Sequence, residues 1–177
     1  SQYTAMGKRL FETSKQFHND VTEFNAIAQR QGLPSFMALV DGSVEVQNLP
    51  PTVVQLGMCC IQMALTRLWA TWGIKPSVVI GHSLGEYAAL EAAGVLSVSD
   101  TIYLVGKRAA LLEEMCTAGT HAMLAVRSPL AALQDVVANS HGKIEVACIN
   151  GLADTVLSGT MADIDAVAEK LAGQGQK

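Results

Sequence analysis

The sequence has little charge and no cluster of charge of one sign. Of its 177 residues 16% are charged, the net charge is −4, and no basic run occurs, so a nucleic-acid-binding surface is not expected. Internal repeats and linker-like tracts are absent as well, while half of the residues are hydrophobic. This balance excludes a disordered chain and predicts a sizeable core in one domain or a domain and a half.

Cysteines are few and lack the spacing of a zinc site. Cys59, Cys60, Cys116 and Cys148 form neither paired Cys-X-X-Cys motifs nor a dense disulfide pattern. We therefore expect four buried thiols in a reducing compartment. No metal site is predicted.

No signal peptide is recognisable at Ser1, and the longest apolar stretch is interrupted by polar residues. Residues 53–72 contain Gln55, Gln62 and Arg67, whereas a membrane span needs about 20 mostly apolar residues. The stretch therefore favours a buried helix of a soluble protein. A cytoplasmic location without membrane contact is the resulting expectation.

Apolar residues recur at helical spacing over much of the first two thirds of the sequence. Two helices are predicted within residues 5–31, with a break near Asn19 and Asp20. Proline at the start and glycine past the end then delimit a long helix between Pro50-Pro51 and Gly73. Composition and capping residues predict two more helices, over residues 86–93 and from residues 97–100 to about residue 116.

Strands are predicted in two places. Val78-Val79-Ile80 is a short β-branched run that suits a buried parallel strand. After Gly119 the order becomes strand, helix, strand, strand, helix, with Asn150-Gly151 in a turn. This order is typical of a ferredoxin-like unit that is one strand short, so we expect the chain to stop inside its second subdomain. The predicted fold class is α/β, with subdomains at residues 1–118 and 119–177.

Gly81-His82-Ser83-Leu84-Gly85 lies between the predicted parallel strand and the helix that follows. In this context a Gly-X-Ser-X-Gly sequence is typical of a nucleophile elbow, a strained turn that exposes the serine hydroxyl at a helix N-terminus. Ser83 is therefore the candidate nucleophile, and the backbone N–H of Leu84 is the candidate oxyanion donor. An ordinary helix-capping serine between two glycines is the alternative interpretation.

The sequence offers no convincing base for Ser83. A serine needs a base to become a good nucleophile, and the four histidines are His18, His82, His121 and His141. His82 is adjacent, but neighbouring side chains on a tight turn point apart, so we expect it to shape the turn. His121 and His141 fall in the second predicted subdomain, where strand-end or surface positions are the commoner explanation.

Arg108 lies on a helical stripe that is otherwise apolar, with Leu104, Leu111 and Met115. A permanent cation in such a place needs a partner. That partner is either a substrate carboxylate held through two hydrogen bonds, or a structural counterion or water. The pattern alone favours the structural alternative.

Gln55 and Gln62 lie a heptad apart on the long helix, which is predicted to be buried nearly all round. Buried amides require hydrogen-bond partners, so these residues either line a pocket or brace loops. The spacing alone favours bracing.

Several motifs together resemble a known family. GHSLGEYAAL, residues 81–90, resembles the active-site motif of malonyl-CoA:acyl-carrier-protein transacylases, and residues 78–115 resemble the acyltransferase domain of type I iterative polyketide synthases. THAMLAV (residues 120–126) and ACINGLADTVLSG (residues 147–159) are similar to fungal non-reducing synthases. The resemblance implies an α/β-hydrolase-like subdomain with a nucleophile elbow, a smaller ferredoxin-like subdomain, and an active site between them.

The resemblance also implies roles for individual residues. Ser83 matches the nucleophile that becomes acylated, and Leu84 matches the backbone oxyanion donor. In the family an arginine pairs with the malonyl carboxylate, a glutamine lies near the active site, and an asparagine lies on a loop facing the cleft. The substrate-binding residues implied here are Arg108, Gln55 and Asn150, and His82, next to Ser83, is a further candidate.

Two features of the family are missing from the sequence. The family begins with a Gly-Gln-Gly-Ser-Gln loop whose first glutamine supplies another oxyanion donor, whereas this sequence starts at Ser1-Gln2, and Gln2 is not the equivalent of that glutamine. The family's catalytic histidine belongs to a segment beyond residue 177. We therefore expect a central piece of the domain that is weak or inactive by itself.

The function implied is transfer of a malonyl unit from coenzyme A to the phosphopantetheine thiol of an acyl carrier protein, through an acyl-serine intermediate. The implied partners are malonyl-CoA, the carrier protein and a neighbouring ketosynthase domain, and the domain itself is expected to bind no cofactor. Two alternatives stay open. One is a serine hydrolase or thioesterase, for which Asp135 and His141 are the only local acid–base pair, and the other is a catalytically incomplete docking fragment.

Overall fold

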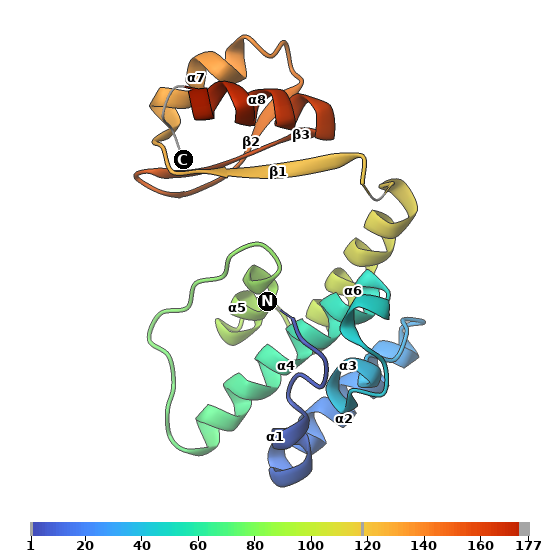
Figure 1. Cartoon of the computed structure of the whole chain (residues 1–177). Helices are drawn as coiled ribbons and strands as arrows, with labels where there is room; N and C mark the ends of the chain where they lie inside the picture. Colours follow the sequence, from blue (N-terminus) through green and yellow to red (C-terminus); the bar gives the residue numbers. More distant parts are fainter. Residues whose placement is uncertain (1, 118, 174–177) are drawn as a thin grey trace. The chain divides into compact units, whose positions relative to one another are not determined.

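The computed structural model describes residues 2–117 and 119–173. The chain is divided into two structural units, with the boundary between Cys116 and Thr117. The first unit is helical, and the second combines a sheet with two helices (Figure 1). Each unit has a hydrophobic core of its own. The chain is therefore α/β as predicted, with a mixture of helices and one small antiparallel sheet.

The first unit is organised around α4, Pro51–Thr71, which contacts α2, α3, α5 and α6. Proline at the first helical position and Gly73 beyond the end delimit this helix as predicted. The remaining elements are α1 (Lys8–Thr13), α2 (Lys15–Arg30), α3 (Met37–Asp41), the 3-10 helix η1 (Val46–Asn48), α5 (Gly85–Ala92) and α6 (Val98–Met115).

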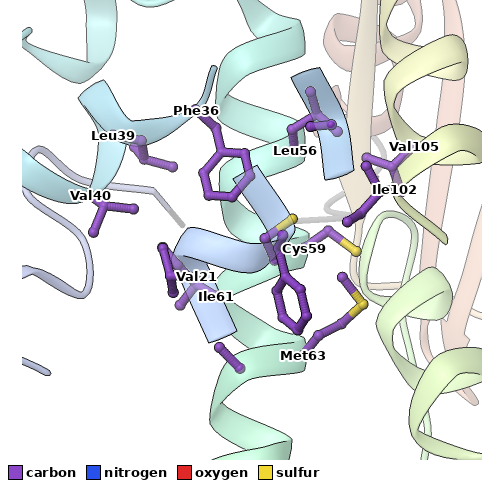
Figure 2. Packing of buried hydrophobic residues seen from close by; sticks show 14 of the residues in the cluster. Val21, Phe36, Leu39, Val40, Leu56, Cys59, Ile61, Met63, Ile102 and Val105 are labelled. Atoms are coloured by element: carbon purple, nitrogen blue, oxygen red, sulfur yellow. The ribbon is translucent and has the colours of Figure 1, made fainter. Parts of the chain in front are cut away.

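α4 is apolar on nearly all sides because it forms the centre of the core. Figure 2 shows Leu56, Cys59 and Met63 from this helix among Phe36 and Ile102, which come from other parts of the unit. In the part of the chain that the structure describes, α4 is the one helix long and apolar enough to cross a membrane. Its burial against other helices is the reason for its apolar composition, as the sequence predicted.

The break between the first two helices was predicted at the wrong place. It lies at Ser14, whose hydroxyl accepts a hydrogen bond from the N–H of Phe17 at 3.3 Å and so caps α2. Asn19 and Asp20 lie inside α2. Asp20 does not act as a cap because its side chain is buried and paired with Arg67, a tertiary contact that overrides its local preference.

The strand predicted at Val78-Val79-Ile80 is also wrong for this structure. The segment between α4 and α5 pairs with no strand among the described residues, and the side chains of Val78 and Ile80 are 84% and 96% exposed. A strand exists only through hydrogen bonds to a neighbour. Within the described residues of the first unit no such neighbour occurs.

The second unit confirms the predicted β-α-β-β-α order. Its three strands form one antiparallel sheet in the order β1-β3-β2, and α7 and α8 pack on one face of it (Figure 1). Asn150 and Gly151 belong to the end of β2 rather than to a turn, and the turn is at residues 152–153. The elements are β1 (His121–Val126), α7 (Leu130–Ala138), β2 (Ile144–Gly151), β3 (Asp154–Thr160) and α8 (Met161–Gly173).

The cysteines are reduced, but only two of them are fully buried. Cys59 and Cys60 lie in the core on α4, Cys148 is half-buried, and Cys116 is exposed after the end of α6. Burial raises the pKa of the Cys59 thiol to about 12, with the nearby Glu91 as a second cause. The pKa of Cys60 is raised as well, mainly by burial, so both thiols are protonated and unreactive at neutral pH.

Candidate active site

Ser83 lies on a tight, strained turn that leads into α5. Its φ angle is +53°, in the left-handed region that residues with a Cβ rarely adopt. The turn is closed by hydrogen bonds from the N–H of Gly85 to the carbonyl of His82 at 3.0 Å and from the N–H of Glu86 to the carbonyl of Ser83 at 3.1 Å. Such strain at a serine is typical of a functional site.

Gly81 is required by the close approach of this turn to α5. A Cβ atom at Gly81 would clash with the backbone of Glu86 and with the carbonyl oxygen of Gly85. A Cβ atom at Gly85 would meet no atom within 4 Å. The turn therefore needs glycine at position 81 for steric reasons, whereas no described residue would clash with a side chain at position 85.

The backbone N–H of Leu84 is free to donate a hydrogen bond to an anion. Leu84 precedes the first residue of α5, and no side chain caps this helix. Within residues 2–117 and 119–173 this N–H donates to no backbone acceptor. Because free N–H groups and the helix dipole favour negative charge at a helix N-terminus, Leu84 can stabilise an oxyanion forming next to Ser83.

A cavity of about 470 Å³ brings together four of the residues predicted for the site. Gln55 comes from α4, Ser83 and Leu84 come from the turn that leads into α5, and Arg108 comes from α6. Three helices that contact one another thus supply these groups. The remaining lining residues are one glutamine and six mostly apolar residues: Gln2, Val46, Leu49, Pro51, Val54, Met58 and Leu112.

Arg108 is half-buried, and its Nη1 donates a hydrogen bond to Oε1 of Gln55 at 2.7 Å. No carboxylate lies within ion-pair distance of it among the described residues. Gln55 is neutral, so the charge of Arg108 is not compensated by this contact. The two residues therefore place an uncompensated cation in the cavity that contains Ser83.

The stripe on which Arg108 was predicted to lie is not the core face of α6. Leu104, Leu111 and Met115 are 40%, 55% and 77% exposed. The buried face of α6 consists instead of Thr101, Ile102, Val105, Gly106 and Ala109. Gln55, whose spacing favoured bracing a loop, contacts the side chain of Arg108 and lines the cavity instead.

Two of the predicted binding residues do not line this cavity. His82 is exposed, and its backbone carbonyl group accepts the hydrogen bond that closes the turn around Ser83. Asn150 belongs to the second unit, where it is exposed near the end of β2. Neither residue is among those that line the cavity.

No histidine lines the cavity among the residues described. The ring of His18 stacks on Phe11 with a centroid distance of 4.2 Å, and Nδ1 of His121 lies 3.0 Å from the hydroxyl of Thr120. His141 adopts a φ of +52° in the second unit. A base for Ser83 is therefore not found among these residues.

Sequence reasoning missed seven residues of the cavity, among them Met58, Leu112 and Gln2. Met58 follows Gln55 by three residues, and Leu112 follows Arg108 by four, so helical spacing was a signal that these pairs share a face. Gln2 lines the cavity as well. No local pattern marked Gln2, because its place depends on packing against residues far along the chain.

Comparisons with known proteins give a consistent result. The family model for the acyl transferase domain matches residues 1–177. Non-reducing polyketide synthase terA of Aspergillus terreus is 55% identical over 171 residues, which are 97% of this chain and 8% of that protein. Non-reducing polyketide synthase albA of Aspergillus brasiliensis is 52% identical over 177 residues, 100% of this chain and 8% of that protein. The chain thus spans about 8% of the length of these relatives.

Solved structures match as well. The acyltransferase domain of the polyketide synthase PpsC of Mycobacterium tuberculosis has a TM-score of 0.87 and 28% identity, covering 99% of this chain and 52% of that one. The acyl-carrier-protein S-malonyltransferase of Burkholderia pseudomallei has a TM-score of 0.79 and 30% identity, covering 100% of this chain and 57% of that one. The similarity is therefore not confined to the serine motif.

Proposed function

The chain belongs to the acyl transferase domain family, and from this premise we propose that it transfers a malonyl unit from coenzyme A to the phosphopantetheine thiol of an acyl carrier protein. The observation that carries the proposal is a single cavity that contains a strained serine and an uncompensated arginine. A nucleophile and a cation that line the same cavity fit an acyl group that carries a carboxylate.

The proposed reaction has two steps. The Oγ of Ser83 attacks the thioester carbonyl of malonyl-CoA, the carbon–sulfur bond breaks, and coenzyme A leaves as a thiol. The N–H of Leu84 stabilises the oxyanion that forms on the carbonyl oxygen. The phosphopantetheine thiol then attacks the malonyl-serine ester, takes the malonyl group and regenerates the serine hydroxyl. We place the base that takes up the proton of Ser83 outside the described residues, since no histidine lines the cavity.

Arg108 is proposed to select the acyl group. Gln55 accepts one guanidinium N–H, and the others can bind the malonyl carboxylate through two parallel hydrogen bonds. An acetyl group offers no carboxylate for this contact. His82 is proposed to keep the turn in shape because it lies next to Ser83 on a tight turn, and Asn150 is proposed as a substrate-binding residue on the basis of the family resemblance.

At the level of the fold, we propose an α/β-hydrolase-like subdomain at residues 1–118 and a ferredoxin-like subdomain at residues 119–177. The strained turn at Ser83 supports the first assignment. The sheet order β1-β3-β2 supports the second, since a ferredoxin-like sheet that lacks its last strand has this order.

The length of the relatives supports a multidomain setting for the chain. They are named as non-reducing polyketide synthases and are about twelve times longer than the matched segment, which covers 8% of them. We propose that the chain forms part of such a synthase in the cytoplasm, beside a ketosynthase domain and a carrier protein domain.

The test is covalent loading followed by transfer. Malonyl-CoA is added to the chain, and intact-protein mass spectrometry measures the mass gain of one malonyl group, which Ser83→Ala should abolish. Adding a phosphopantetheine-bearing carrier protein should then move the group to the carrier. Loading should be slow, because no histidine lines the cavity among the described residues, and loading that is unchanged in Ser83→Ala contradicts the proposal. Rapid release to water without transfer indicates the serine hydrolase alternative.

A further inference from the structure

We propose that Gln55 is a positioning residue, which holds the guanidinium of Arg108 in the orientation that receives the carboxylate of the acyl group. Selection of carboxylated over uncarboxylated acyl groups would then depend on Gln55 as well as on Arg108. This inference rests on the proposed function, because it concerns the same cavity and the same substrate class.

The contact between the two residues is short and links two helices. Oε1 of Gln55 on α4 accepts the hydrogen bond from Nη1 of Arg108 on α6 at 2.7 Å. Hydrogen bonds that involve an ionised group are shorter and stronger than those between neutral groups. Both side chains are half-buried and line the cavity with Ser83, so this bond fixes the guanidinium close to the reacting group.

Among the described residues, Gln55 is the side chain to which Arg108 is hydrogen-bonded. Met58 and Leu112, the helical neighbours of Gln55 and Arg108, also line the cavity but carry no hydrogen-bonding group of comparable strength. An arginine side chain has many rotamers, and holding it in one of them before the substrate arrives improves binding. The amide of Gln55 performs this function without adding a charge.

The neutrality of Gln55 distinguishes Arg108 from Arg67, another arginine of the first unit. Arg67 is paired with Asp20 at 2.9 Å and with Glu23 at 3.6 Å, so its charge is compensated inside the fold. Arg108 has no carboxylate partner among the described residues. A glutamine therefore orients the guanidinium and leaves its full charge for a ligand, whereas a glutamate at this position would neutralise it.

The experiment compares malonyl and acetyl loading of Ser83 in two variants of Gln55. Gln55→Leu removes the acceptor, and the rate of malonyl loading at low malonyl-CoA concentration should fall about tenfold, while acetyl loading stays within about twofold. Gln55→Glu keeps the acceptor but adds a charge that pairs with Arg108. It should also lower malonyl loading selectively, through weaker binding rather than a slower maximal rate.

Gln62→Leu is the matched control, because Gln62 lies a heptad further along α4 and does not line the cavity. It should leave the ratio of malonyl to acetyl loading unchanged. Thermal unfolding of each variant shows that it is folded, and Gln55→Glu serves as the test if Gln55→Leu does not fold.

The outcomes separate this inference from the proposed function. Equal losses of malonyl and acetyl loading in the Gln55 variants mean that Gln55 only braces the helices, and they overturn the inference. A ratio that changes in Arg108→Ala but not in the Gln55 variants overturns the inference alone. A ratio that is unchanged even in Arg108→Ala overturns the proposed role of Arg108 in selection, and the inference with it.

Discussion

Nη1 of Arg67 on α4 lies 2.9 Å from Oδ1 of Asp20 on α2, and this ion pair joins the two helices through the core of the first unit. Nε2 of Gln16 donates to the other carboxylate oxygen at 2.8 Å, and the guanidinium carbon of Arg67 lies 4.8 Å from the ring centroid of Phe24. Every polar atom of the Asp20 carboxylate thus has a partner. Arg67 is therefore a structural arginine.

Asp20→Ala should destabilise the first unit. The substitution leaves Arg67 without its buried partner, and the expected loss is about 1–3 kcal/mol, below the usual range for a fully buried pair because Arg67 is partly solvated. Urea unfolding measures it. Glu23→Ala is the control, since this exposed carboxylate lies 3.6 Å from Arg67 and should contribute less than about 1 kcal/mol. Equal losses in both variants would argue against a buried structural pair.

Arg108→Ala should change the choice of acyl group. Losing the carboxylate contact should lower malonyl loading of Ser83 about tenfold to a hundredfold, as expected for hydrogen bonds to a charged group, while acetyl loading is spared or improved. Parallel loading assays with malonyl-CoA and acetyl-CoA give the ratio. An equal decrease for both substrates would mean that Arg108 is a structural residue.

Gly81→Ala should impair the loading of Ser83, whereas Gly85→Ala should be tolerated. The methyl group at Gly81 would clash with the backbone of Glu86, so the turn must shift. A displacement of about 1 Å can lower the rate of Ser83 loading about a hundredfold. Gly85→Ala adds a methyl group with no atom within 4 Å of it at the first position of α5, and should preserve the fold and loading. Thermal unfolding and loading assays test both, and tolerance of Gly81→Ala contradicts the geometry.

Ser83→Gly should be more stable than Ser83→Ala, although neither can be acylated. The φ of +53° at Ser83 strains any residue with a Cβ, whereas glycine adopts it readily. The difference in unfolding free energy should be about 0.5–1 kcal/mol, reduced by the greater freedom of glycine in the unfolded chain. Chemical unfolding of the two variants measures it. If Ser83→Ala is equally stable, the turn is not strained.

The first unit should lose stability in alkali. The pKa of Cys59 is raised from 9.0 to about 12 in the folded state, first by burial and second by Glu91, so the folded state binds the thiol proton more tightly than the unfolded state does. The contribution is complete below about pH 9 and disappears as the pH rises from about 9 toward 12. Unfolding free energies across this range should fall less steeply for Cys59→Ala.

Thiol alkylation gives an independent check of the same burial. Iodoacetamide at pH 8 should modify the exposed Cys116 in the folded chain, while Cys59 and Cys60 react only after unfolding. Peptide mass spectrometry identifies the modified residues. Rapid modification of Cys59 under native conditions would contradict the packing around α4.

Local signals were sufficient for most of the helices. Pro51 at the start of α4 and the Ser97 hydroxyl, which accepts from the N–H of Asp100 at 3.1 Å, act within a few residues of the helix ends that they define. The strand at Val78-Val79-Ile80 was wrong because strand pairing requires a partner from elsewhere. The position of the first helix break was wrong because Arg67, 47 residues away from Asp20, keeps Asp20 inside α2.

The candidate site was predictable to a similar extent. Ser83 and Leu84 are neighbours within one short sequence motif, so both could be predicted without knowledge of the fold. The contact between Gln55 and Arg108 spans 53 residues, so the sequence marked both side chains but not their pairing. Gln2 had no signal at all, since its position in the cavity depends on tertiary packing.

Ser83 and Arg108, the proposed acylation point and the proposed carboxylate anchor, both lie within residues 1–116 and so belong to the same structural unit. The packing of α4, α5 and α6 therefore fixes the distance between Ser83 and Arg108. This distance sets how far the thioester carbon and the terminal carboxylate of a bound acyl group can lie from each other. In the proposed reaction, acyl groups whose two ends are too close together or too far apart would not contact both residues at once. Substitutions of residues that pack between these three helices, away from Ser83 and Arg108, should therefore change which diacid thioesters are accepted.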